Sequence, residues 1–391
     1  MANSPGNAAK SSCNRCKGPL ALYTLRNYPT CRNCYVDYVE IKAGRRLGAL
    51  ARDTRTSARP APRKYLAGLS FGPSSTAMTS ILDDSAKFHS SRKSSPAFEP
   101  LVVHVDANLS HSGPAQDAPA HKLLARYRDR FPNVRFEYVH LSQVLSIKSM
   151  DWSSFLQVED RAGSEGDDTA RLRAFLNSLP SATSRADMLR LLVRNLLLDM
   201  ALDRSSSALL LGHSTTALAS LSLSEVANGR GFTVSWQVND GPYRVCFHGQ
   251  GQESSKGSEV RWVEMPVYYP LREILRHEIV RYLDLVPSLR DLVPANDAGP
   301  TSVVSHKDLS IEEVIRRYFD GVEGLYSGIV NNVVRTTGKL DRAMGSDGCS
   351  MCGVGVDEQG DERWAGELGD DLGKPGGGTK LCYGCRRTMD G

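Results

Sequence analysis

The stretch that decides the fold is residues 69–78, LSFGPSSTAM. An apolar run, residues 65–69, leads into it, and a stretch with helical character, residues 74–82, follows it. A strand, a turn of small residues and a helix N-terminus form a phosphate-binding geometry, because free backbone N–H groups and the positive end of the helix dipole face the anion. Phe71 stands where the backbone would pass close to a phosphate, and the turn holds no acidic residue for magnesium. The stretch predicts a phosphate-binding shape whose chemistry has changed.

Short apolar segments alternate with amphipathic ones after this turn. The predicted strands are residues 64–69, 101–106, 134–140, 207–212 and 261–267. The predicted helices are residues 74–84, 117–130, 185–203, 214–226 and 271–284. Such alternation favours an α/β fold, in which helices cover both faces of a parallel sheet. Two polar inserts, residues 85–98 and 146–182, predict surface loops.

Composition places the chain among globular proteins. Its 391 residues, of which 40% are hydrophobic and 24% charged, predict two or three folded units. The formal net charge of +4 is too small to indicate a partner by itself. No apolar run reaches the roughly 18 residues that span a bilayer, and residues 1–13 lack the apolar core of a signal peptide. We therefore expect a cytoplasmic protein with no membrane partner.

Cysteines form the strongest local pattern. Eight of the nine fall in four C-x-x-C pairs, with 14 residues between the first two pairs and 29 between the last two. The pairs are Cys13 with Cys16, Cys31 with Cys34, Cys349 with Cys352, and Cys382 with Cys385. Two such pairs complete a tetrahedral shell of four sulfurs, which favours structural zinc over a redox dithiol and leaves no open position for catalysis. We expect two zinc ions, bound separately or by mixed pairing of the terminal modules, and a buried apolar role for Cys246.

These features divide the chain into five parts. We expect a disordered N-terminus (1–12), a zinc ribbon with its following helix (13–51), a basic linker (52–63), an α/β domain (64–340) and a C-terminal zinc module (341–391). Within the α/β domain, residues 307–320 predict a further helix with Ser310 as N-cap and Glu313 at the capping-box position. In the C-terminal module, the Gly-rich residues 353–379 predict a flexible excursion.

A basic run follows the first cysteine module. It consists of Lys42, Arg45, Arg46, Arg52, Arg55, Arg59, Arg63 and Lys64. Only Asp53 opposes these charges within the run, so the segment can neutralise several phosphates. It predicts an RNA-facing surface, to which Arg386 and Arg387 could add. The alternative is a solvated linker.

Three segments resemble the PP-loop ATPase superfamily, which has an adenine nucleotide alpha hydrolase-like fold. The superfamily turn Ser-Gly-Gly-x-Asp-Ser corresponds to SFGPSS at residues 70–75. The thiolating branch carries Gly-His-Asn-x-Asp-Asp, which corresponds to GHSTTA at residues 212–217, and Pro-Leu-Lys/Arg, which corresponds to PLR at residues 270–272. With residues 183–189, TSRADML, and the terminal cysteine modules, the chain is most similar to the cytoplasmic tRNA 2-thiolation protein 2 family, the second subunit of the eukaryotic wobble-uridine thiolase.

The resemblance implies a subunit that has lost its own chemistry. Phe71 replaces a glycine, Ser74 replaces an aspartate, and residues 216–217 replace two carboxylates, so the ring should obstruct a phosphate and ATP is not an expected cofactor. Residues 180–184 contain no cysteine, so no iron–sulfur cluster and no catalytic residue are expected. The implied partners are a catalytic PP-loop sulfurtransferase in a heterodimer, tRNA, and a ubiquitin-related protein that carries the sulfur.

Some residues of the old site could still bind a ligand. The backbone around Ser70, Gly72, Ser74 and Ser75 could hold a phosphate or sulfate. His213 and Asp106 follow or end predicted strands and could face the same cleft, or serve only as a hydrogen-bonded edge residue and a loop cap.

Apolar faces of residues 189–200 or 311–319 could contact the catalytic partner, or could simply pack in the core. Two other functions remain open: an ATP-dependent tRNA sulfurtransferase active on its own, and a zinc-ribbon interaction adaptor unrelated to RNA.

Overall fold

A six-stranded sheet forms the centre of the protein. The computed structural model describes residues 12–18, 20–54, 62–92, 98–110, 118–152, 155, 167–247, 261–294, 309–342, 347–356 and 381–390. The strands are β3 (Arg63–Gly68), β4 (Phe98–Asp106), β5 (Arg135–His140), β6 (Ala208–Leu210), β7 (Gly241–Phe247) and β8 (Arg261–Tyr268). They lie in the order β5-β4-β3-β6-β8-β7. All neighbours are parallel except β7, which pairs antiparallel with β8. The predicted α/β fold with a mainly parallel sheet is confirmed.

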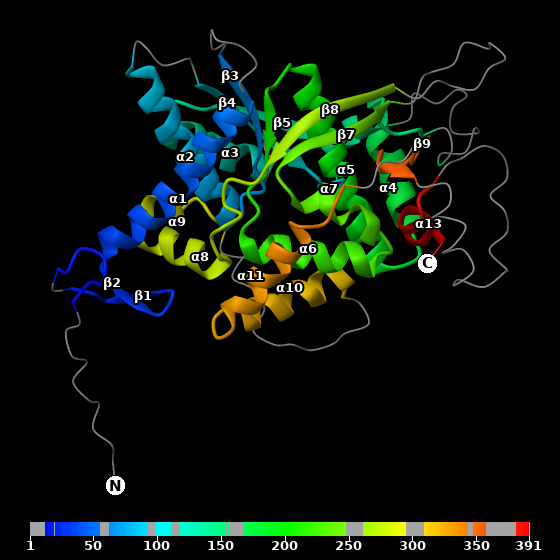
Figure 1. Ribbon diagram of the computed structural model, residues 1–391. Coiled ribbons are helices and arrows are strands. Elements are labelled where there is room, and N and C mark those ends of the chain that lie inside the picture. Colours follow the sequence, from blue (N-terminus) through cyan, green and yellow to red (C-terminus); the bar gives the residue numbers. More distant parts are fainter. Residues whose placement is uncertain are drawn as a thin grey trace.

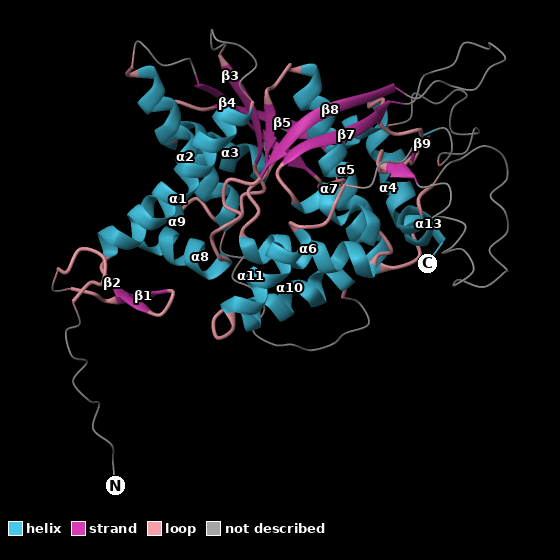
Figure 2. Ribbon diagram, viewed as in Figure 1, coloured by secondary structure: helices cyan, strands magenta, loops and turns pink. Residues whose placement is uncertain are grey.

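Helices cover both faces of the sheet (Figure 1, Figure 2). One face packs against α1 (Arg32–Asp53), α2 (Pro73–Ser90), α3 (Pro119–Arg130), α8 (Arg276–Leu285) and α9 (Pro287–Arg290). The other packs against η1 (Leu141–Ser146), α4 (Asp168–Ser178), α5 (Ala182–Asp203), α6 (Thr215–Ala227) and α7 (Val234–Val238), and η4 (Gly231–Thr233) lies against α6 and α7. Outside α6 lie α10 (Ile311–Val322) and α11 (Ser327–Thr337) (Figure 1). Each face therefore has its own hydrophobic core.

The two cysteine modules extend this sheet-and-helix body. The N-terminal module contains the hairpin β1 (Tyr23–Leu25) and β2 (Tyr28–Thr30). Its two-residue turn, Arg26 and Asn27, has φ values of 48° and 71°, as a tight hairpin turn requires. The C-terminal module contains the short pair β9 (Asp347–Gly348) and β10 (Gly355–Val356) and the helix α13 (Tyr383–Asp390).

The structure differs from the prediction in the polar inserts. Helix α2 continues to Ser90, and α4 lies within the insert 146–182, so these segments are not loops throughout. Their serines and charged residues are the exposed faces of amphipathic helices rather than loop signals. The helix predicted for 271–284 begins only at Arg276, after a turn. Helix α10 begins as predicted, with the Ser310 hydroxyl accepting a hydrogen bond of 3.2 Å from the Glu313 N–H.

Most of the Gly-rich stretch 353–379, like residues 1–11, lies outside the described residues. No helix in the described part of the chain is both long and apolar enough to cross a bilayer.

One buried carboxylate joins the N-terminal module to the body. Glu278, in the first turn of α8, accepts a 2.9 Å hydrogen bond from the Leu275 N–H and so caps its own helix. Its other oxygen forms a 2.9 Å ion pair with the Arg26 guanidinium of the hairpin turn. The Glu278 side chain is 0% exposed. Arg26 and Glu278 are 252 residues apart in the sequence, so the position of the hairpin depends on a distant part of the chain.

We predict that Glu278→Gln destabilises the protein by about 3 kcal/mol. This value is the lower end of the range for breaking a buried ion pair, because the Arg26 side chain is 38% exposed and water screens part of the interaction. Urea unfolding measures the change. Glu273→Gln is the matched control: that side chain is 48% exposed and lies 3.7 Å from Lys42, so we expect a loss below about 1 kcal/mol. Equal losses in the two variants would contradict this role of Glu278.

Candidate functional site

A cavity of about 680 Å³ lies at the carboxyl ends of β3, β4 and β6. Ligands of parallel α/β proteins bind in this position, where the loops after the strands diverge. The four turn residues singled out in the sequence, Ser70, Gly72, Ser74 and Ser75, all line it. So do His213, Asp106 and Arg276. The structure thus brings the candidate residues of the cleft together.

The turn after β3 is held by hydrogen bonds of its own side chains. The Ser75 hydroxyl donates to the Gly72 carbonyl oxygen at 3.0 Å and accepts from the Ser70 N–H at 3.3 Å. The Thr76 hydroxyl donates to the same carbonyl at 2.9 Å and contacts the Tyr127 hydroxyl at 2.6 Å. The Ser74 and Ser75 N–H groups lie in the first turn of α2, where a helix has no internal acceptor for them. The turn can therefore keep its phosphate-binding shape by itself.

Gly212 crosses this turn at close range. A Cβ atom at position 212 would lie 3.0 Å from the Ser75 Cα and 3.2 Å from its nitrogen. These are backbone atoms and cannot move aside as a flexible side chain would. A glycine is therefore needed where the segment after β6 passes the first turn of α2.

Phe71 keeps the backbone conformation of the glycine that it replaces. Its φ is 60°, in the left-handed region that side chains rarely adopt. The expected obstruction of the cleft is wrong, because the ring is not among the residues lining the cavity. It is 7% exposed and packs against His104, with ring centroids 4.1 Å apart, and Tyr127, at 5.3 Å. Packing with the core of this face offsets the cost of the strained backbone.

Asp106 is the single carboxylate among the residues that line the cavity. It accepts a 2.9 Å hydrogen bond from the Asn108 N–H and a 2.5 Å hydrogen bond from the Tyr138 hydroxyl. These contacts match the loop-capping alternative. Desolvation, together with this hydrogen bond, raises the pKa of Tyr138, so the phenol remains a donor.

A carboxylate that the sequence analysis did not reveal contacts Thr216, a residue at one of the positions where the resemblance expects a carboxylate. Glu323, at the end of α10, accepts a hydrogen bond from the Thr216 hydroxyl. It also accepts from the N–H groups of Arg276, at 3.2 Å, and His277, at 2.8 Å, which begin α8. Glu323 therefore caps α8 and ties α10 to the edge of the cleft. Its distance along the chain hid this role, because local sequence spacing carries no signal for it.

His213 is held neutral at the wall of the cavity. Burial, with the charges of Arg194 and Arg190, lowers its pKa to about 4. Its ring meets the Tyr269 ring edge-on at 5.4 Å. Near pH 7 the imidazole is therefore an uncharged group beside buried cations.

The cysteine pairs form two separate four-sulfur clusters. In each cluster the ligand atoms all lie within 4.8 Å of one another. The distance between Cys16 and Cys31 sulfurs is 3.7 Å, and between Cys352 and Cys382 sulfurs it is 3.8 Å. Backbone N–H groups point at sulfurs in both clusters, at 3.3 Å in the first and 3.4 Å in the second. Such donors favour thiolates, so each cluster could hold a metal ion.

The clusters differ in burial. All four C-terminal cysteines are buried, whereas Cys16 is exposed. Cys246 is buried, as expected for a small apolar residue, and packs directly under the C-terminal module: a Cβ at Gly348 would overlap its sulfur.

The basic run divides into structural and exposed residues. Lys42 contacts the Glu273 carbonyl at 3.0 Å, and Arg46 pairs with Asp240 and, at 3.5 Å, with Glu273. These two side chains hold α1 against the segment before α8 and the residue before β7, and their RNA-facing role stays a prediction. The remaining members have different surroundings. Arg45, Arg52 and Lys64 are exposed, Arg63 lies 3.3 Å from His89, and Arg55 and Arg59 fall outside the described residues.

Arg387, one of the two C-terminal arginines that could add to the RNA-facing surface, donates to the Ala227 carbonyl at 2.9 Å.

We predict that Phe71→Gly, which restores the glycine of the superfamily turn, destabilises the protein by about 2 kcal/mol. Losing the buried ring costs about 3–5 kcal/mol, while relief of the left-handed backbone returns about 1–2 kcal/mol. Urea unfolding gives the net change. Ser205→Gly is the control. Ser205 is exposed and has a φ of 51°, so this variant relieves backbone strain without removing a buried side chain. A Phe71→Gly variant more stable than the wild-type protein would contradict the stabilising role of the buried ring.

Comparisons with known proteins agree with these observations. Residues 310–371 match the family model described as cytoplasmic tRNA 2-thiolation protein 2. A protein of that name from Phaeosphaeria nodorum is 33% identical, covering 98% of this chain and 95% of its own. Another from Pyrenophora tritici-repentis is 31% identical, with coverages of 98% and 95%. A third, from Sclerotinia sclerotiorum, is 32% identical, with coverages of 84% and 82%.

A solved structure shares the fold. It is the U34-tRNA thiolase NcsA from Methanococcus maripaludis with its 4Fe-4S cluster, which superposes with a TM-score of 0.52 at 14% identity and covers 88% of this chain and 92% of that one. At this identity the likeness concerns the fold alone, and it agrees with an α/β core between the two four-cysteine clusters. The nearly full-length identity above 30% is the stronger finding. The chain belongs to the cytoplasmic tRNA 2-thiolation protein 2 family.

Proposed function

We propose that this protein is a non-catalytic subunit of a cytoplasmic complex that thiolates the wobble uridine of tRNA at position 2. The observation that carries the proposal is the cavity, which keeps the shape of a nucleotide site while only one of the described residues that line it, Asp106, is a carboxylate. Membership of the tRNA 2-thiolation family supports the pathway. A catalytic PP-loop sulfurtransferase is the partner in a heterodimer, and a ubiquitin-related carrier protein supplies the sulfur.

The proposal follows from what adenylation requires. Activating a tRNA base with ATP places new charge on the leaving pyrophosphate, which cationic groups and carboxylate-bound metal must stabilise. Removing a single stabilising group of this kind costs about 10²–10³ in rate. Here Ser74, Thr216 and Ala217 stand where three carboxylates are expected, and Asp106 is already bonded to Tyr138 and a backbone N–H. The partner therefore performs the chemistry, and this chain supplies binding surface and stability.

The cysteine clusters fit structural zinc. Four sulfurs about 2.3 Å from a tetrahedral zinc ion lie about 3.8 Å apart, and the Cys16–Cys31 and Cys352–Cys382 sulfurs are 3.7 and 3.8 Å apart. In a 4Fe–4S cluster each cysteine binds a different iron, which holds the sulfurs farther apart than the 4.8 Å within which all four sulfurs lie here. The N-terminal ion would be held by Cys13, Cys16, Cys31 and Cys34, and the C-terminal ion by Cys349, Cys352, Cys382 and Cys385. Bound zinc supplies folding energy to each small module.

The exposed face of α10 and α11 is our choice for the partner contact. Of the two apolar segments considered, residues 189–200 lie in α5, whose leucines are mostly buried in the core. The α10–α11 pair instead exposes Val314, Tyr318, Leu325, Tyr326 and Ile329. Exposed aromatic and aliphatic side chains gathered on neighbouring helices are typical of protein–protein contacts. The segment also lies within the residues that the family model matches.

A reconstituted reaction tests the proposal. Purified protein, the catalytic partner, or both are incubated with tRNA, ATP and a sulfur donor, and thiolated tRNA is read on a mercury-containing gel. We expect product only, or far more product, when both proteins are present. Product from this chain alone would establish the alternative, an independent sulfurtransferase. No gain over the partner alone, with a non-RNA partner recovered from cells, would favour an interaction adaptor.

We propose that tRNA binds the exposed residues of the basic run, Arg45, Arg52 and Lys64. Replacing all three with Gln removes three phosphate contacts, so the slope of log K against log salt should fall by about 1 per residue. Filter binding of the full-length protein at several salt concentrations measures the slope. The control triple, Arg281, Arg335 and Lys339 to Gln, removes the same charge from exposed positions elsewhere. Equal slopes for the two triples would disprove a specific tRNA surface here.

A further inference from the structure

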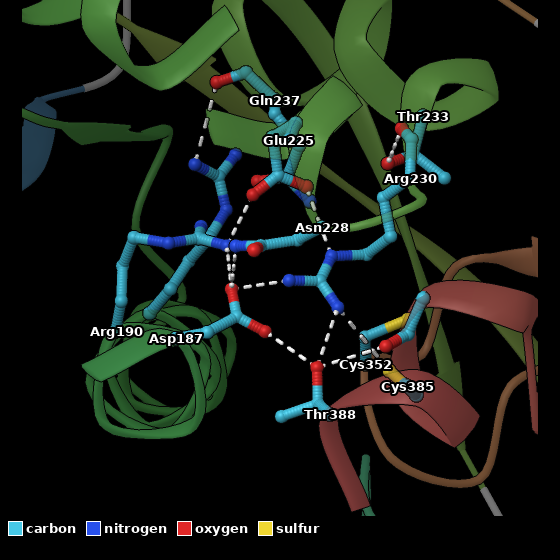
Figure 3. A network of polar contacts seen from close by, with 12 residues as sticks. Asp187, Arg190, Glu225, Asn228, Arg230, Thr233, Gln237, Cys352, Cys385 and Thr388 are labelled. Carbon is cyan, nitrogen blue, oxygen red and sulfur yellow. Dashed lines mark hydrogen bonds and ion pairs between the residues drawn. The ribbon is translucent and has the colours of Figure 1, made fainter. Parts of the chain in front are cut away.

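A cluster of buried charges joins the C-terminal cysteine centre to the helical core (Figure 3). Asp187 and Arg190 come from α5, Glu225 comes from α6, Arg230 follows α6, and Thr388 comes from α13. Arg230 is 0% exposed and heads the fully buried side chains in size. The proposed function gives these residues no role, and none of them lines the cavity.

Arg230 uses each edge of its guanidinium. Its Nε donates to Glu225 at 3.1 Å, and its Nη2 pairs with Asp187. Its Nη1 lies 3.4 Å from the Thr388 hydroxyl and 4.0 Å from the Cys385 sulfur. Figure 3 shows the guanidinium between the carboxylates and the cysteine module. Nη1 therefore faces the Cys385 sulfur of the C-terminal cluster, while Asp187 and Glu225 hold the other two nitrogens.

The backbone is shaped to bring the module onto this cation. A Cβ atom at Gly384 would overlap the Arg230 side chain, and one at Gly229 would overlap the Tyr383 ring. Gly229 also has a φ of 78°, which favours glycine. Thr388 completes the joint by donating to Asp187 at 2.8 Å. Helix α13 and the turn after α6 thus fit together only with glycine on each side.

Charge explains why a cation belongs there. Asp187 and Glu225 each pair with both Arg190 and Arg230, and so hold the Arg230 guanidinium in place. Four thiolates on one divalent ion carry a net charge of −2, and the four cysteines are at most 2% exposed. Burying uncompensated charge is costly, so hydrogen-bond donors and cations must lie beside the sulfurs. The Cys382 N–H supplies one donor, to the Cys349 sulfur at 3.4 Å, and the Arg230 guanidinium supplies the cation.

We infer that Arg230 is a positioning residue of the C-terminal metal centre, whose guanidinium faces the Cys385 sulfur and stabilises the negatively charged metal–sulfur cluster, and so ties metal binding to the docking of α13 on α5 and α6. This inference rests on the proposal that the centre holds zinc. Residues just outside the ligands of a metal change its affinity by about 10–100-fold when they are replaced. We expect a change of this size for Arg230.

The control separates charge at the sulfur from general damage to the network. Arg190 pairs with the same two carboxylates, Asp187 and Glu225, and has no recorded contact with a cysteine sulfur among the described residues. Arg190→Met therefore removes a buried cation from the same acids without changing what faces Cys385. Arg230→Lys keeps the charge and loses the planar fork, and Arg230→Met loses both.

The experiment uses the full-length chain in all four forms. Zinc affinity is measured by competition with a chelator, and the cadmium-loaded proteins are examined by ¹¹³Cd NMR, with Cys16→Ser assigning the N-terminal signals. We expect Arg230→Met to weaken zinc binding at the C-terminal centre by about 10–100-fold, Arg230→Lys to recover part of it, and Arg190→Met to leave it within about threefold. Arg230→Lys should also shift the C-terminal cadmium resonance and leave the N-terminal one in place.

Two results would overturn the inference. One is equal weakening in the Arg190 and Arg230 variants, which would reduce Arg230 to a part of the core. The other is an unchanged C-terminal cadmium resonance in Arg230→Lys. Should Arg230→Met fail to fold, the comparison of Arg230→Lys with Arg190→Met decides. If the wild-type protein binds one zinc ion instead of two, the zinc assignment in the proposed function is wrong. That outcome is distinguishable from the two results that overturn the role of Arg230.

Discussion

The close passage of Gly212 over the turn after β3 is the constraint on which the cleft depends. Parallel pairing of β3 with β6 aligns Ala67 with Leu210, so the two chains leave the sheet side by side. The segment after β6 then runs against backbone atoms of Ser74 and Ser75. This contact fixes where α2 and α6 begin, and with them the walls of the cavity. A side chain at position 212 would push the walls apart.

Shape and chemistry depend on different residues in this cleft. The shape comes from strand pairing, the turn hydrogen bonds and the burial of Phe71, all of which also stabilise the fold. The chemistry of an adenylating enzyme would come from a few carboxylates that contribute little to folding. In this chain Thr216 donates to Glu323 and Phe71 packs against His104, so both positions contribute to the stability of the fold. The shape of this cavity therefore does not depend on carboxylates at positions 74, 216 and 217.

Sequence reasoning recovered what is local. The buried strands, the phosphate-shaped turn and the spacing of the cysteine pairs all depend on neighbours in the chain, and each appears in the structure. It missed what depends on distant partners. Charge alone predicted an RNA-facing role for Lys42 and Arg46 and gave no sign of their contacts with Glu273 and Asp240. Nothing near Glu278, Glu323 or Arg230 in the sequence indicates their distant partners, which are Arg26, Thr216 and Asp187. Strand β7 was overlooked because its antiparallel edge lacks the βα alternation of its neighbours.

The buried position of Arg230 has a consequence for how the protein is made. Its partners in α13, Cys385 and Thr388, lie 155 and 158 residues farther along the chain. At about 5–20 residues per second, a ribosome needs on the order of 10–30 s to reach them. During that interval the turn after α6 carries a cation destined for the interior that still lacks its last neighbours. The α5–α6 face of a nascent chain therefore stays open longer than the opposite face, and this is where chaperones would have most to protect.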